Sequence, residues 1–297
     1  MTAARLNLSH TTLRDCAPLL DSFFAAAREA GVTPRLVIDL QGPELRVGAL
    51  VEPVELAEGG DVILGDGGVP VPRSVPDAAE PGDRLSLDDS AFLLEVAAKE
   101  DAALRCRVLR GGTLQSRKSL AILGKEVDSP ALTEADRANL RDAGCFGVTD
   151  VLQPFVRGAE DVRAVRAALD AAGLTRVRVM AKIENRRGLA HLDDILTATD
   201  EICIARGDLG NAMPLWELPR AQKEIAHRCR ERGVPFCVAT QLLWSMHERA
   251  VPTRAEVLDI HNCVLDGASG LMLTGETAVG KYPAEAMRYL VKTAENA

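Results

Sequence analysis

Two strand-like runs decide the fold: Val177-Arg-Val-Met-Ala-Lys-Ile-Glu184 and Glu201-Ile-Cys-Ile-Ala-Arg-Gly-Asp208. Alternate residues of an extended strand share a face, so Met180, Lys182 and Glu184 point one way and the apolar residues between them point the other. The second run repeats the pattern and predicts that Arg206 and Asp208 are aligned. One continuous apolar face with charge at the carboxyl-terminal end is typical of a parallel barrel strand, whose outer face packs on helices.

The composition indicates an ordinary soluble globular protein. Hydrophobic residues make up 47% of the 297 residues and charged residues 26%, the usual balance for such proteins. No run approaches the roughly 18 apolar residues that span a bilayer, and Met1 opens no signal-peptide pattern. The formal net charge is −8 with acids and bases interspersed, so we expect neither a nucleic-acid surface nor a membrane face.

The seven cysteines include no Cys-x-x-Cys pair, which disfavours a zinc knuckle or a redox motif. Cys203 and Cys237 lie inside apolar strand runs. We expect both to be small buried hydrophobic residues with free thiols, in a protein of the reducing cytoplasm.

Strands and helices alternate along the chain outside one interval. Short alternating segments separated by Gly, Pro and Asp fill residues 49–118, which predicts a small all-β inserted domain, with the barrel formed by residues 1–48 and 119–297. Seven barrel strands are predicted, near Arg5, Arg35, Val148, Val177, Glu201, Pro235 and Gly270. A TIM-type (β/α)8 barrel has eight strands, so we expect an α/β barrel that lacks its first strand and helix.

Helix signals flank the predicted strands. Thr133 is followed three residues later by Asp136, which resembles a capping box and predicts a helix that runs toward Gly144. A second helix is predicted over Gln241 to Glu248, directly after the strand at Pro235.

Polar residues recur at the carboxyl-terminal ends of five predicted strands. They are Arg5 with Asn7 and Ser9, Asp39, Lys182 with Glu184, Asp208, and Thr240. Because parallel barrel strands end at one rim, we expect these residues to form a shared active site rather than separate structural ion pairs.

The residue types at this rim favour metal-assisted chemistry on an anion. Glu184 and Asp208 are hard oxygen ligands suited to Mg²⁺, which completes its octahedron with water and substrate oxygens. Lys182 and Arg5 add positive charge beside them. Together these groups form a clamp for a phosphate or carboxylate, which could stabilise a phosphoryl group in transfer or an enolate.

A second cation site is predicted on the first two strands. Asn7, Ser9 and Asp39 could form an oxygen cage for it. The alternative is that Asn7 and Ser9 only hydrogen-bond the backbone of a loop.

Several longer motifs run through the sequence. The first two are Ala4-Arg-Leu-Asn-Leu-Ser-His10 and Ile38-Asp-Leu-Gln-Gly-Pro-Glu-Leu-Arg46. Three more are Ala239-Thr-Gln-x-Leu-x-Ser-Met246, Pro252-Thr-Arg-Ala-Glu-Val257 and Leu273-Thr-Gly-Glu-Thr-Ala-x-Gly-x-Tyr-Pro283. Together with Lys-Ile-Glu-Asn and Ala-Arg-Gly-Asp-Leu-Gly in the opening runs, they resemble motifs of the pyruvate kinase family over nearly the whole chain.

The resemblance implies phosphoryl transfer from phosphoenolpyruvate to ADP, giving pyruvate and ATP in glycolysis. It implies Mg²⁺ or Mn²⁺ and K⁺ as cofactors, and it makes the β insertion a lid that closes over the site. Arg5 and Lys182 would stabilise the phosphoryl group, and Thr240 would act through water near the face where the enolate is protonated. Glu44 matches a residue of the K⁺-dependent members.

The resemblance also assigns binding residues position by position. Substrate contacts fall on Arg5, Lys182, Gly207, Asp208 and Thr240. The nucleotide side falls on Asn7, His10, Arg46 and Lys118. Mg²⁺ falls on Glu184 and Asp208, and K⁺ on Asn7, Ser9, Asp39 and the backbone carbonyl of Leu40.

Two other interpretations stay open at this point. A Mg²⁺-dependent oxoacid lyase or aldolase would use the same acids and cations without a nucleotide. A truncated barrel could instead bind a ligand without turnover. Assembly of the chain into a homo-oligomer is compatible with each interpretation.

Overall fold

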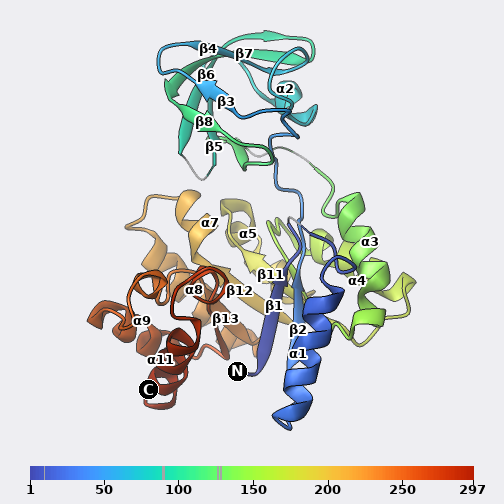
Figure 1. Cartoon of the computed structure of the whole chain (residues 1–297), viewed down its shortest axis with the longest axis vertical. Helices are drawn as coiled ribbons and strands as arrows, with labels where there is room; N and C mark the ends of the chain where they lie inside the picture. The colour runs from blue at the N-terminus through green and yellow to red at the C-terminus, as the bar shows by residue number, and fades with distance from the viewer. Residues whose placement is uncertain (10, 89–90, 126, 128) are drawn as a thin grey trace. The chain divides into compact units, whose positions relative to one another are not determined.

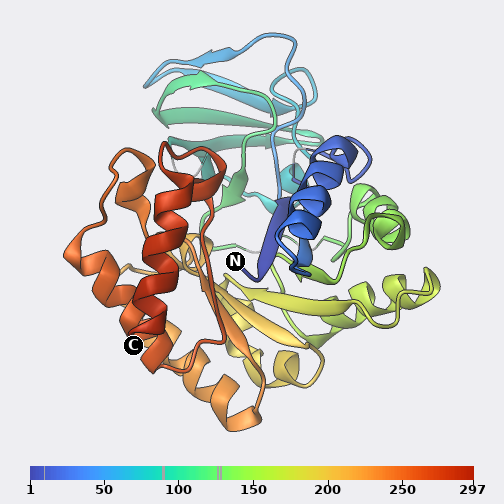
Figure 2. The same cartoon turned by 60° about the horizontal axis from the view of Figure 1, so that its bottom comes forward.

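In a computed structural model that describes residues 1–9, 11–88, 91–125, 127 and 129–297, the seven predicted barrel strands form one parallel sheet. In sheet order they are β1 (Ala3–Asn7), β2 (Arg35–Asp39), β10 (Asp150–Gln153), β11 (Arg178–Ile183), β12 (Glu201–Ala205), β13 (Phe236–Ala239) and β14 (Gly270–Met272). Figures 1 and 2 show that the sheet curls, with helices along its outer face. The predicted α/β barrel class is confirmed. Among the described residues no strand pairs with the outer edge of β1 or β14, so the sheet is open there.

The two faces of the sheet contact different layers, as the predicted alternation requires. Val179, Ala181 and Ile183 of β11 belong to the large apolar core between sheet and helices. Cys203 and Cys237 face the interior of the curled sheet, where they are buried as free thiols. The predicted alternation of faces along the strands is confirmed, and so is the predicted burial of Cys203 and Cys237 as free thiols.

The helices of this unit cover the apolar face of the sheet (Figure 2). They are α1 (Ala17–Glu29), α3 (Glu134–Asp142), α4 (Ala159–Ala171), α5 (Arg186–Ala190), α6 (Leu192–Leu196), α7 (Arg206–Asn211), α8 (Leu218–Arg232), α9 (Arg254–Leu265), α10 (Gly275–Ala278) and α11 (Pro283–Glu295). In α4, Val162, Val165 and Leu169 lie three or four residues apart and are all buried, which gives the helix one apolar stripe. Within the described residues, none of the helices combines the length and the apolar character needed to cross a bilayer.

Two sequence predictions about element boundaries are wrong. The predicted helix from Gln241 to Glu248 is only a 3₁₀ turn, Trp244–His247, because the chain leaves β13 through a left-handed turn at Thr240 and Gln241. Strand β12 ends at Ala205, and Arg206 opens α7. Arg206 and Asp208 are therefore not alternate residues of one strand, and their predicted alignment is lost.

Residues 43–130 form the second compact unit, and the first consists of residues 1–42 and 131–297. The second unit contains β3 (Val54–Leu56), β4 (Asp61–Gly65), α2 (Ser74–Ala78), β5 (Arg84–Leu87), β6 (Phe92–Glu100), β7 (Ala103–Arg110), β8 (Gly112–Leu114) and β9 (Leu120–Ile122). Its strands pair antiparallel, in the orders β4-β7-β6-β5-β9 and β3-β8. The unit extends beyond the predicted 49–118 because Val47 is buried in its core and the Val47 amide donates to the Lys118 carbonyl.

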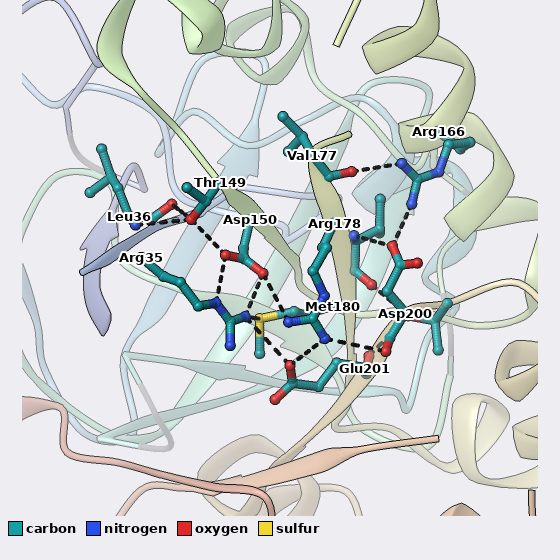
Figure 3. Close-up of polar contacts among 12 residues, drawn as sticks. Arg35, Leu36, Thr149, Asp150, Arg166, Val177, Arg178, Met180, Asp200 and Glu201 are labelled. Carbon is teal, nitrogen blue, oxygen red and sulfur yellow. Dashed lines mark hydrogen bonds and ion pairs between the residues drawn. The ribbon is translucent and has the colours of Figure 1, made fainter. Parts of the chain in front are cut away.

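A ring of alternating charges occupies the amino-terminal end of the barrel sheet (Figure 3). It joins the first residues of four strands, Arg35, Asp150, Arg178 and Glu201. Arg35 Nε donates to Asp150 Oδ2 at 2.8 Å, and Arg178 Nη2 to Glu201 Oε2 at 2.9 Å. Each buried carboxylate contacts both arginines. The charges at this end therefore neutralise one another, as expected of a structural layer.

Candidate active site

Arg5 and Asp39 form the first pair at the opposite, carboxyl-terminal end of the sheet. Strands β1 and β2 are paired in register, with Asn7 opposite Asp39. Arg5 Nε and Nη2 lie 2.8 and 2.5 Å from Asp39 Oδ2. Asp39 is only 2% exposed, so the arginine charge is fixed by a buried carboxylate.

Lys182 links this pair to a second carboxylate on β11. Lys182 Nζ lies 3.7 Å from Asp39 Oδ2 and 3.3 Å from Glu184 Oε2. Its side chain is 14% exposed, and the Glu184 side chain is fully buried. The Phe155 amide, just beyond β10, donates to Glu184 Oε1 at 2.6 Å. Arg5, Asp39, Lys182 and Glu184 thus form one continuous chain of alternating charge.

Burial perturbs Glu184 strongly. It raises the pKa of Glu184 to about 7, although the neighbouring Lys182 ammonium and the Phe155 amide lower it. The charge of Asp208 raises the pKa of Glu184 further, so these two carboxylates are electrostatic neighbours. Burial opposes the charge of Lys182, but Glu184 and Asp39 outweigh it and raise the pKa of Lys182. Lys182 therefore stays charged beside Glu184. Ionisation of the buried Glu184 carboxyl would be favoured by additional positive charge, such as that of a bound cation.

Four buried side-chain oxygens at the carboxyl-terminal ends of the strands have no hydrogen-bond partner within the part of the chain that the structure describes. They are Asp39 Oδ1, Gln153 Oε1, Glu184 Oε2 and Thr240 Oγ1. Of these, Glu184 Oε2 is ion-paired with Lys182 Nζ at 3.3 Å. Buried polar atoms are satisfied in most proteins, so an unmet acceptor is typical of a site that receives a ligand or ion. This end of the sheet differs in that respect from the self-neutralised amino-terminal end.

Gly207, Asp208 and Thr240 come from the neighbouring strand ends. Gly207 and Asp208 lie in α7, directly after β12, and Thr240 follows β13. A Cβ added to Gly207 would lie 3.7 Å from Thr240 Oγ1. The structure therefore places Gly207 near Thr240 and Asp208 within electrostatic reach of Glu184.

The residues predicted for a second cation lie at the ends of β1 and β2. Asn7 ends β1, and its Oδ1 accepts from the Ser9 amide at 3.1 Å, so the predicted alternative of loop hydrogen bonding holds for this oxygen. The Leu8 amide donates to the Asp39 carbonyl at 2.9 Å, and the Leu40 amide to the Leu152 carbonyl at 3.1 Å. His10, predicted on the nucleotide side, lies outside the described residues.

Two residues predicted on the nucleotide side, Arg46 and Lys118, fall in the second unit. Arg46 pairs with Glu44 at 2.5 Å and donates from Nη1 to the Arg117 carbonyl at 2.8 Å. Lys118 Nζ lies 3.0 Å from Asp88 Oδ1. Both cations therefore have acidic partners inside their own unit.

Asp136 is a supporting residue that the sequence signalled only as a helix cap. Its carboxylate closes the predicted capping box of α3, with Thr133 as N-cap. The same carboxylate accepts from the Gln41 amide at 2.8 Å and from the Gly42 amide at 3.1 Å. Gly42 is needed here, since its φ is +65° and a Cβ would lie 2.4 Å from Pro154 Cγ. Asp136 therefore holds the loop that follows Asp39 and Leu40.

Comparison with known proteins identifies the family. The family model "Pyruvate kinase, barrel domain" matches residues 1–287. The chain belongs to the pyruvate kinase family. It is 40% identical over 297 residues to pyruvate kinase of Aeropyrum pernix, 37% over 299 residues to that of Geobacillus stearothermophilus, and 36% over 312 residues to pyruvate kinase 1 of Trypanosoma brucei brucei. The resemblance of the motifs is thereby confirmed.

The chain spans 65%, 51% and 61% of the length of these three pyruvate kinases, while 97–99% of its own length is covered. The shared part is the barrel domain with its inserted β unit.

Pyruvate kinases are in general metal-dependent enzymes, and the rim fits a divalent cation. Glu184 and Asp208 are electrostatic neighbours, and Glu184 Oε2 is a buried acceptor without a hydrogen bond. No group of three or more His, Cys, Asp or Glu is arranged for a metal among the described residues. A divalent ion held here by Glu184 and Asp208 would take its other ligands from water and substrate, an arrangement that suits Mg²⁺.

Proposed function

We propose that the chain transfers a phosphoryl group from phosphoenolpyruvate to ADP, giving pyruvate and ATP in glycolysis, with Mg²⁺ or Mn²⁺ and K⁺ as cofactors. The observation that carries the proposal is the rim cluster, in which Lys182 Nζ is ion-paired at 3.3 Å with Oε2 of the buried Glu184 and Asp39 Oδ1 is a buried acceptor without a hydrogen bond among the described residues. This cluster combines fixed positive charge with buried carboxylates, the groups that phosphoryl transfer and its metal ion require.

Arg5 and Lys182 hold the phosphoryl group in this proposal. Both are restrained by Asp39, at 2.5 and 3.7 Å, so their charges are in place before substrate arrives. Donors that need no rearrangement stabilise the charge of the transferred group most effectively. A divalent ion on Glu184 and Asp208 would supply further positive charge for the phosphate and carboxylate of the substrate.

Thr240 acts, in this proposal, on the enolate that becomes pyruvate. Its Oγ1 is buried without a hydrogen-bond partner among the described residues, which leaves it able to hold a water molecule. We assign to that hydroxyl the delivery of a proton, through water, to the enolate left by phosphoryl transfer. Gly207, which lies beside Thr240, and Asp208 complete the proposed substrate contacts.

K⁺ is assigned to Asn7, Ser9, Asp39 and the Leu40 carbonyl. The free Oδ1 of Asp39 supports this assignment. His10, Arg46 and Lys118, together with Asn7, are assigned to the nucleotide, and the β unit to the role of lid. These assignments rest on the family resemblance of each position.

The decisive experiment supplies phosphoenolpyruvate and ADP with and without Mg²⁺ and K⁺. Mg²⁺-dependent ATP formation supports the proposal, whereas cleavage of an oxoacid without nucleotide would favour a lyase. If Mg²⁺ with phosphoenolpyruvate fails to raise the melting temperature, the site does not bind its substrate and the proposal fails.

Asp208→Asn should raise the Mg²⁺ concentration required for ATP formation. The matched control is Asp194→Asn, because the Asp194 side chain is 74% exposed.

A further inference from the structure

The chain turns sharply at Thr240 and Gln241, directly after β13. Their φ angles are 73° and 54°, in the left-handed region that residues other than glycine rarely adopt. Thr240 is β-branched, so this conformation is unfavourable for it and persists only where the surroundings hold it. A residue assigned to the chemistry therefore depends on a neighbouring support.

Arg206 makes the contacts that hold this turn. Its Nε and Nη2 donate to the Thr240 carbonyl oxygen at 3.2 and 2.8 Å. Its third nitrogen, Nη1, donates to Asp259 Oδ2 at 2.7 Å. The Arg206 side chain is 11% exposed, so these contacts are largely shielded from water. Arg206 thereby joins the start of α7, the end of β13 and helix α9, which Figure 1 shows in one part of the barrel unit.

The carbonyl and the side chain belong to the same residue, so the contacts that hold the Thr240 backbone also set where its side chain begins. Gly207 lies near the Thr240 side chain, since a Cβ added to Gly207 would lie 3.7 Å from both Oγ1 and Cγ2 of Thr240. Arg206 and Gly207 are consecutive, so one two-residue segment holds the Thr240 carbonyl and lies beside the Thr240 hydroxyl. That hydroxyl is the one left without a hydrogen bond among the described residues.

We propose that Arg206 is a positioning residue that holds Thr240 Oγ1 toward the carboxyl-terminal rim, and that Asp259 holds Arg206 in place. Only a planar guanidinium can donate to one carbonyl from two nitrogens and still reach a carboxylate with the third. The effect on turnover rests on the proposed function, since it acts on the step in which the enolate is protonated. The effect on the geometry of Thr240 does not.

The first test is a double-mutant cycle on ATP formation by the full chain. Arg206→Lys should lower kcat by about tenfold or more while KM for phosphoenolpyruvate changes less than about threefold, because substrate binding is not its task. In a Thr240→Val background the same change should have little further effect. Full additivity of the two substitutions overturns the proposal, since Arg206 would then act independently of the hydroxyl.

The matched control is Arg228→Lys. Arg228 likewise bridges two partners, here two acids, with Nε 2.8 Å from Glu224 Oε1 and Nη1 2.8 Å from Asp193 Oδ2, but its side chain is 39% exposed. The Arg228→Lys variant should leave kcat for ATP formation unchanged. An equal loss of kcat in Arg228→Lys would show that any arginine bridge has this effect and would overturn the proposal.

The second test needs no turnover. NMR of threonine methyl groups in the full chain reports Thr240 directly, and its signal is identified by its loss in Thr240→Val. Arg206→Lys and Asp259→Asn should each shift that signal, and Arg228→Lys should not. An unmoved Thr240 signal in both variants overturns the positioning role. A wild type that forms no ATP but shows the shifts contradicts only the proposed function.

Discussion

At the scale of single residues, Glu184 makes stability depend on pH. Burial raises its pKa from 4.5 to about 7, so the folded protein retains a proton that the unfolded chain releases. The stabilisation from this proton is complete below pH 4.5 and is lost as the pH rises through 7. We expect the melting temperature of the metal-free wild type, minus that of Glu184→Gln, to fall between about pH 5 and pH 8, because glutamine does not titrate.

Glu160→Gln is the control for this pH dependence, since the Glu160 side chain is 85% exposed. Differential scanning fluorimetry in matched buffers gives both differences. If the difference for Glu184→Gln is as flat with pH as that for Glu160→Gln, Glu184 does not titrate near neutrality.

Lys182→Met should abolish phosphoryl transfer, with a loss of about a hundredfold or more in kcat, because the positive charge nearest Glu184 is removed. The methionine stem keeps the packing, so circular dichroism should be unchanged. Lys182 is also the largest influence that lowers the pKa of Glu184, so this pKa should rise further in the variant. Lys223→Met, on a side chain 56% exposed, is the control. Turnover near the wild-type level in Lys182→Met would remove Lys182 from the mechanism.

The alternation of residues along strands made part of the site predictable. Lys182 and Glu184 are two residues apart in one strand, so their shared face follows from the extended backbone alone. The contacts of Asp136 with Gln41 and Gly42 did not follow, because they join residues about 95 positions apart. Only the local half of that carboxylate's role, the capping box, leaves a sequence signal.

At the scale of elements, the α3 capping box is tied to the site. Asp136→Ala removes four acceptor contacts, to the Thr133 amide and hydroxyl and to the amides of Gln41 and Gly42. We expect it to lower the free energy of unfolding by about 2–4 kcal/mol, measured by urea denaturation. Thr133→Ser keeps the capping hydroxyl and should stay within about 0.5 kcal/mol of wild type. A cost for Asp136→Ala as small as that would contradict the shared role of this carboxylate.

The segment after β13 shows why an element can be predicted wrongly. Leu242, Leu243 and Met246 have helical spacing, and all three are buried. The apolar spacing therefore agrees with the observed burial. It gave no sign of the left-handed turn at Thr240 and Gln241, because the Arg206 contacts that hold this turn come from another strand end. At this site tertiary contacts, rather than the local apolar spacing, determine the backbone conformation.

At the scale of the whole molecule, the regular alternation of strand and helix predicted the seven-stranded sheet, and the change of texture at residue 49 predicted the β insertion. The limits of the second unit were harder to predict from the sequence than its presence. Val47 and Ile122 are buried in its core, although both lie outside the predicted limits of 49 and 118. Each packs through partners far along the chain: the Val47 amide bonds the Lys118 carbonyl, and Ile122 pairs with Leu85.

The second unit should fold by itself. The described residues that build its core run from Leu45 to Val127, all inside residues 43–130, and its described strands pair with one another. A fragment of residues 43–130 is long enough to form a single cooperative core. We expect dispersed amide NMR signals and a single urea transition for it. A shorter fragment of residues 49–118, which omits Val47 and β9, should unfold at lower urea concentration or not fold. Equal stability of the two fragments would contradict the wider boundaries.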